Sequence, residues 1–176
     1  ELWKTDGTQA GTVMVKDINP GAPGSFPQEM LVVGGELFFQ AFGFAGTELW
    51  VTDGTTGGTQ ILLDIYPGGS SYPEQLTPFG SGFVVRAETG ANGNELWMSD
   101  GTAAGTQMVA DIHPTDGSYP FGMTVFGNTV LFSADDGTNG IEPWISDGTP
   151  GGTFMLADVH PTSSSAPSDF VSVGAR

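Results

Sequence analysis

Glu48-Leu49-Trp50-Val51-Thr52-Asp53-Gly54-Thr55 is one of four related stretches that recur at intervals of 47 residues. The other three begin at Glu1, Glu95 and Glu142, and the last has Pro143 where the others have Leu. Each stretch is followed by a second Gly-Thr and then by an Asp that precedes Ile or Val, at Asp17, Asp64, Asp111 and Asp158. Self-similarity at a fixed period of this length indicates an array of stacked structural units.

One unit, residues 73–112, shows the expected strands. We predict strands over 74–79, 83–87, 95–99 and 106–112, because these runs are short, rich in β-branched or aromatic residues, and bounded by Gly, Asp, Asn or Pro. No long stretch has a helical apolar period without a Gly or Pro interruption. Four short antiparallel strands per unit predict an all-β fold built of β-propeller-type blades.

Neighbouring large apolar residues distinguish this fold from its alternatives. Leu96 and Trp97 are adjacent in a predicted strand, so they point to opposite faces of the sheet. Sheets that are covered on both faces have this pattern, and stacked blades are covered in this way. A β-sandwich, with one solvated face, would alternate more cleanly, and a β-solenoid would have shorter coils.

We predict one repeat domain over residues 1–176, made of about four repeats. Complete blades are expected at 26–65, 73–112 and 120–159, and an incomplete joining blade would be split between 1–18 and 167–176. This split blade lacks one inner strand, so its first strand could not pair with its third. We therefore expect either further polypeptide or a strand from another chain to complete it, and an exchange of the second kind would propagate into a polymer.

Composition restricts the function. The chain has 20 Asp and Glu against 4 Lys and Arg, a formal net charge of −16. This charge repels phosphate backbones and anionic lipid, so nucleic-acid and membrane-surface binding are disfavoured. No apolar run is long enough for membrane insertion. The absence of Cys excludes disulfides, thiolate catalysis and Cys-ligated metals.

Several repeated residues are expected to serve the scaffold. An Asp that opens a connection between strands can accept backbone hydrogen bonds in an Asx-type turn, which predicts hairpin clamps at Asp6, Asp53, Asp100 and Asp147. A Trp in every unit predicts core between blades, at Trp3, Trp50, Trp97 and Trp144.

One acidic loop is the candidate metal site. Asp135 and Asp136 precede Gly and Asn residues, and Glu142 follows shortly after. Hard cations prefer such carboxylate and amide oxygens, so these three residues are candidate calcium ligands. The loop over 42–47 has no carboxylate, so a calcium site in every repeat is not expected. If these residues do not bind calcium, we expect the loop over 135–140 to be a solvated acidic loop.

The motif over 48–55, with Gly58-Thr59 and Asp64-Ile65, resembles the ELWxxDGT repeat of large exported bacterial proteins. The resemblance covers essentially the whole chain, with Pro143 as a departure in the fourth copy. It implies a propeller-like array and an extracellular or cell-surface location, often beside calcium-binding or adhesive modules, and it implies no defined activity.

No nucleophile elbow, phosphate-binding loop or zinc spacing occurs in the chain. We therefore expect a non-enzymatic scaffold, such as a subunit of a surface layer or filament, whose partners are further copies or the rest of a longer chain. The alternative is a glycan-binding or glycan-processing propeller, because Phe42, Phe44, Tyr72 and Tyr119 lie in predicted loops.

Overall fold

The computed structural model describes residues 1–21 and 24–171 and confirms the all-β prediction. The described residues form four antiparallel sheets and one short 3-10 helix, η1 (Pro150–Gly152). The first sheet has two strands, β1 (Leu2–Lys4) and β2 (Val13–Lys16). Each of the other three has four strands that follow one another in sequence order.

The second sheet contains β3 (Gln28–Val33), β4 (Glu36–Gly43), β5 (Gly46–Thr52) and β6 (Gln60–Leu63). The third contains β7 (Glu74–Phe79), β8 (Gly82–Thr89), β9 (Gly93–Ser99) and β10 (Gln107–Ala110). The fourth contains β11 (Phe121–Phe126), β12 (Thr129–Asp135), β13 (Ile141–Ser146) and β14 (Phe154–Met155).

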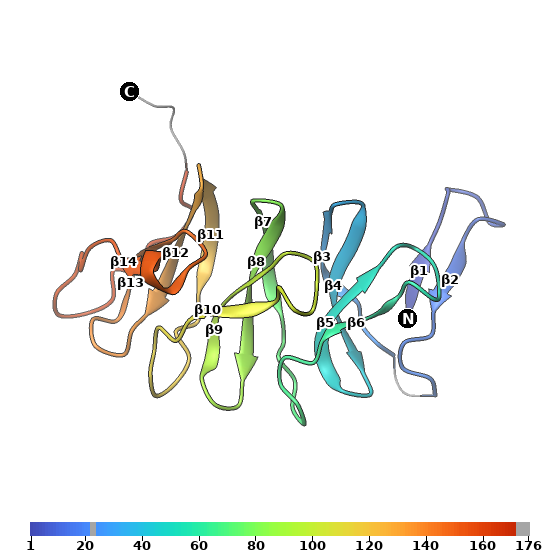
Figure 1. Cartoon of the computed structure of the whole chain (residues 1–176), viewed down its shortest axis with the longest axis horizontal. Helices are drawn as coiled ribbons and strands as arrows, with labels where there is room; N and C mark the ends of the chain where they lie inside the picture. Colours follow the sequence, from blue (N-terminus) through green and yellow to red (C-terminus); the bar gives the residue numbers. More distant parts are fainter. Residues whose placement is uncertain (22–23, 172–176) are drawn as a thin grey trace.

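The four sheets stand side by side in one row (Figure 1). The first strands of the three complete sheets, β3, β7 and β11, contact each other in turn, and we call them the inner strands. The row stays open, because β1 and β2 lie at one end and the segment after β14 lies at the other (Figure 1). The two parts of the expected split blade therefore do not meet among the described residues, and its residues 172–176 lie outside them.

Local sequence sets the strand boundaries. Gly34 and Gly35 join β3 to β4 with φ values of 62° and 88°, as a tight hairpin turn with two left-handed residues requires. The loop predicted over 88–94 is shorter than expected, because β8 and β9 remain paired from Phe83 and Ser99 out to Thr89 and Gly93. The strand predicted over 106–112 is also shorter, since β10 ends at Ala110.

The core lies between neighbouring sheets, and the sheets contribute apolar side chains to it from both of their faces. Leu49 packs in the cluster that joins the second sheet to the third, with Phe38, Phe83 and Val85. Its neighbour Trp50 packs in the cluster that joins the second sheet to the first. The same division holds one repeat later for Leu96 and Trp97, so the predicted opposite orientation of these neighbours is confirmed.

In the part of the chain that the structure describes, no helix is both long and apolar enough to cross a membrane.

Candidate functional site

The hairpins that close each unit are held by their Asp residues. In the third sheet, Oδ1 of Asp100 accepts the backbone N–H of Thr102 at 2.8 Å and its hydroxyl at 2.7 Å. The Thr102 hydroxyl oxygen in turn accepts the N–H of Gly105 at 3.0 Å. The same bonds occur at Asp6, Asp53 and Asp147. These bonds form the Asx-type turn, and hydrogen bonds from Thr102 lower the pKa of Asp100.

The second Gly of each hairpin leaves room for this turn. A Cβ placed on Gly105 would overlap the carboxylate of Asp100, and the equivalent overlap occurs at Gly11, Gly58 and Gly152. The paired Asp and Gly therefore form one packing unit. All four Asp residues are exposed and bonded within their own hairpins, which is a scaffold role.

A buried glutamate holds the connection between successive sheets. Glu48 has no solvent exposure, and its carboxylate accepts the N–H of Ile65 at 3.0 Å and the N–H and hydroxyl of Ser71 at 2.9 and 2.5 Å. The Ser71 carbonyl then accepts the N–H of Glu88 in the third sheet at 2.7 Å. Ser71 is thus fixed between two sheets, and Glu48 determines where the chain crosses.

The same glutamate clamp occurs in later repeats, but the direction of the shift in the glutamate pKa differs between them. Glu95 accepts from Ile112, His113 and Ser118, and Glu142 accepts from Val159 and Ser165. Burial raises the pKa of Glu95 and of Glu48 in spite of these hydrogen bonds. Burial also acts on Glu142, but its bonds from Ser165 and Val159 outweigh it and lower the pKa. The third sheet lies between two others, whereas no described sheet follows the fourth.

The three candidate calcium ligands are bonded to separate partners. Asp135 accepts the N–H of Gly137 at 2.7 Å, while Asp136 accepts the N–H groups of Thr138 and Asn139 at 2.9 and 2.7 Å. Glu142 is occupied by the clamp. Across residues 1–21 and 24–171, no group of three or more His, Asp or Glu side chains is arranged to hold a metal ion. The structure therefore does not bring Asp135, Asp136 and Glu142 together as one site.

The four Trp residues have unequal environments. Trp50 is 3% exposed and packs against Leu2, Val15 and Ile18 of the first sheet. Trp97 and Trp144 are partly buried against the preceding sheets. Trp3 is 59% exposed, so the prediction that it lies in the core is wrong for the described residues. The reason is that each Trp faces the preceding sheet, and the described residues include no sheet in front of Trp3.

The first sheet also has a free edge beside Trp3. β5 has β4 and β6 as neighbours, whereas β1 pairs only with β2 among the described strands. A pocket of about 220 Å³ occupies the space where a counterpart of β4 would lie, between Trp3 and Leu2 of β1 and Leu37 of β4. We call Trp3, Met14 and the free edge of β1 the leading face.

The opposite end of the row presents a second apolar surface. Val159 is 61% exposed, although its repeat equivalents Ile18, Ile65 and Ile112 are buried against the following sheet. Phe126 is also exposed, whereas its equivalents Val33 and Phe79 pack against the sheet that follows theirs. We call Phe126, Val159 and the outward side of the fourth sheet the trailing face.

The two ends of the row differ in charge. Both lysines of the chain, Lys4 and Lys16, lie in the first sheet, and their ammonium groups donate to carbonyls in the hairpin that joins β5 to β6. Residues 120–171 contain no Lys or Arg and six acidic residues, Asp135, Asp136, Glu142, Asp147, Asp158 and Asp169. The leading end is therefore much less negative than the trailing end.

A search of protein-family models and a search of curated proteins both find no match to this chain.

Sequence reasoning missed the glutamate clamp. It identified the repeated Glu but not its partner, the serine at Ser25, Ser71, Ser118 and Ser165. This serine recurs at 46- or 47-residue intervals before an X-Pro pair, which is the signal that could have identified it.

Proposed function

We propose that this protein is a non-enzymatic repeat scaffold that assembles head to tail, with its leading face packed on the trailing face of another copy. The observation that carries the proposal is the contrast between Trp3 and Trp50. The two residues occupy the same repeat position. Trp50, which packs against the preceding sheet, is buried, whereas Trp3 is exposed.

Three interfaces within the chain show what such a contact would look like. At each one, a Trp of one sheet packs in the same apolar cluster as an Ile of the sheet before it, for example Trp50 with Ile18 and Trp144 with Ile112. Trp3 of one copy and Val159 of another would repeat this arrangement. The charge difference between the ends favours head-to-tail over tail-to-tail contact, because two acidic trailing ends would repel each other.

The contact joins two different surfaces, so it leaves one of each free and does not close by itself. Such heterologous contacts generate rings when the rotation closes and filaments when it does not. A propeller-like ring or a filament is compatible with this geometry, and an extracellular surface layer is the setting that we propose for it. A strand added to the free edge of β1 would extend the contact by backbone hydrogen bonds.

Sedimentation velocity tests this proposal. We expect the average mass of the wild-type chain to rise with concentration and Trp3→Ser to reduce that rise. Phe44→Ser is the matched control, because Phe44 is an even more exposed aromatic, on a loop of the second sheet. A wild-type chain that stays monomeric at all concentrations would contradict the proposal and point to a flanking segment of the same chain as the occupant of the leading face.

A second candidate function, glycan binding, is favoured by a different observation, the aromatic residues beside the inner strands.

A further inference from the structure

Three exposed aromatics lie at the same repeat position, just before an inner strand. Phe26, Tyr72 and Tyr119 each precede a proline and have φ values of 47°, 43° and 49°. L-residues rarely adopt this left-handed backbone, and a following proline disfavours it further. Their side chains are nevertheless about half exposed, at 58%, 51% and 50%. Ala166 has the same backbone in the fourth repeat, with a φ of 44°, so this conformation belongs to the linker, and the exposed aromatic ring is what distinguishes the first three repeats.

The backbone of Tyr72 is held from both sides. Its N–H donates to the carbonyl of Thr47 at 3.2 Å, and the preceding Ser71 is fixed by the buried carboxylate of Glu48. The linker is therefore anchored before the ring is reached. The ring is presented by a rigid element, so a ligand would not have to order it first.

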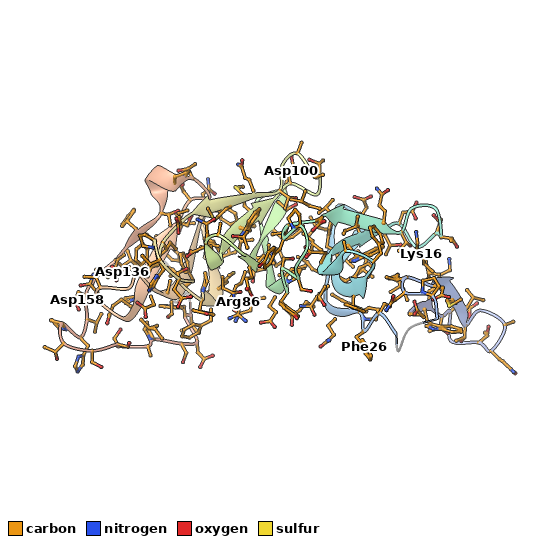
Figure 2. The ribbon with its side chains drawn as sticks, turned by 90° about the horizontal axis from the view of Figure 1, so that it is seen from below. Lys16, Phe26, Arg86, Asp100, Asp136 and Asp158 are labelled. Carbon is orange, nitrogen blue, oxygen red and sulfur yellow. The ribbon has the colours of Figure 1, made fainter. Side chains whose placement is uncertain are left out.

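Tyr72 lines a pocket of about 420 Å³ between the second and third sheets. Phe26 and Phe42 supply two further aromatic side chains, and Gln28, Thr47 and Glu74 supply polar groups. The volume is in the range of small-molecule sites, and aromatic walls with a few polar groups are typical of them. Phe26 lies on the side of the row opposite the Asp100 hairpin (Figure 2). Phe26 therefore lies away from the Asp100 hairpin, and the pocket shares no residue with the leading or the trailing face.

The polar groups of the pocket favour a ligand rich in donors. The Glu74 carboxylate is an acceptor, and Arg86 of the neighbouring strand β8 donates to one of its oxygens. The side-chain amide of Gln40 donates one of its two N–H groups to the carbonyl of Pro73 at 3.0 Å, which leaves one donor for a ligand hydroxyl. Hydroxyl groups of a sugar can donate to a carboxylate, whereas the carbonyls of a proline-rich peptide cannot.

The net charge of the chain and the aromatic rings of the pocket restrict the chemical class of the ligand. A net charge of −16 opposes phosphorylated, sulfated or uronic ligands. The faces of aromatic rings carry partial negative charge, which suits the C–H faces of a pyranose ring.

We propose that the pocket formed by Phe26, Phe42, Tyr72 and Glu74 binds a neutral saccharide unit. The proposal goes beyond head-to-tail assembly, and either one can fail without the other, because the pocket and the end faces share no residue.

The test uses an array of neutral and anionic oligosaccharides, followed by calorimetric titration of the best neutral ligand. We expect at least one neutral ligand to bind with a dissociation constant of about 1 mM or tighter, an energy that a single shallow site can supply. Tyr72→Gly should weaken that binding about tenfold or more, roughly the worth of one aromatic contact. Glycine accepts the positive φ, so this variant keeps the fold.

Two controls make the result specific. Tyr72→Phe keeps the ring and should bind as the wild type does. Tyr119→Gly makes the same backbone change one repeat further on and outside the pocket, so it should leave the affinity unchanged. The proposal is overturned by a blank array, by neutral ligands whose affinity Tyr72→Gly does not change, by a preference for anionic ligands, or by tighter binding of a proline-rich peptide.

Discussion

The carboxylate of Glu95 accepts the hydroxyl of Ser118 at 2.6 Å and its N–H at 3.1 Å, which ties the third sheet to the linker that enters the fourth. Glu95 is fully buried, so removing its carboxylate would leave these donors in the interior without their partner. The repeated Glu therefore fixes the linkers between sheets that are also joined by apolar clusters.

Glu95→Ala should destabilise the chain strongly. The change leaves N–H groups of Ile112, His113 and Ser118 without a partner, and each such buried group costs about 1–3 kcal/mol. We expect a loss of about 3–5 kcal/mol, as for other broken buried charge contacts. Urea unfolding measures it, with the exposed Glu36→Ala as the control. A loss no larger than that of the control would contradict the clamp.

Two clamps should respond to pH with opposite sign. Burial raises the pKa of Glu95, so its contribution to stability is largest below the unfolded pKa of about 4.3 and is lost as pH rises through the folded pKa. The pKa of Glu142 is lowered, because the hydrogen bonds from Ser165 and Val159 outweigh its burial. Its contribution is present above the unfolded pKa and is lost as pH falls.

Glu95→Gln and Glu142→Gln separate these effects in urea unfolding between pH 3.5 and 7. We expect the stability advantage of the wild type over Glu95→Gln to shrink as pH rises. The advantage over Glu142→Gln should grow over the same interval. Slopes of the same sign for both variants would show that position in the row does not set the electrostatics of the clamp.

The hairpin Asp and its glycine should show energetic coupling. Gly105→Ala places a methyl group on the Asp100 carboxylate and should lower the unfolding midpoint. Asp100→Ala should lower it as well, because the turn bonds to Thr102 are lost, while Asp100→Asn keeps an acceptor and should have a smaller effect. In the double variant the overlap is gone, so the second change should cost less than it does alone. Strictly additive effects would contradict this packing.

Replacing equivalent tryptophans should lower the free energy of unfolding by unequal amounts when the chain is dilute enough to be monomeric. Trp50→Ala empties a buried site and should cost about 3–5 kcal/mol. Trp3→Ala removes an exposed side chain and should cost less than about 1 kcal/mol at concentrations where the chain is monomeric. Chemical unfolding of both variants, with Phe44→Ala as an exposed control, measures the difference. A large loss for Trp3→Ala in the monomer would show that the leading face is not free.

Local sequence patterns were enough to predict most of the strands and the burial of both sheet faces. The adjacent Leu96 and Trp97 indicated a sheet buried on both faces, and the structure places them in two different clusters. The exposure of Trp3 could not be predicted from its repeat position, because burial depends on whether a sheet precedes it. The role of Glu95 was also missed, since its partner Ser118 lies 23 residues away and meets it only after the linker folds back.

Complementation between blocked ends tests head-to-tail assembly most directly. Trp3→Ser blocks the leading face, and Val159→Asp blocks the trailing face. We predict that each variant alone sediments as a monomer, and that an equimolar mixture forms a dimer that does not grow further, because only one pair of intact faces remains. A mixture that stays monomeric while the wild type associates, or single variants that still dimerise, would contradict the account.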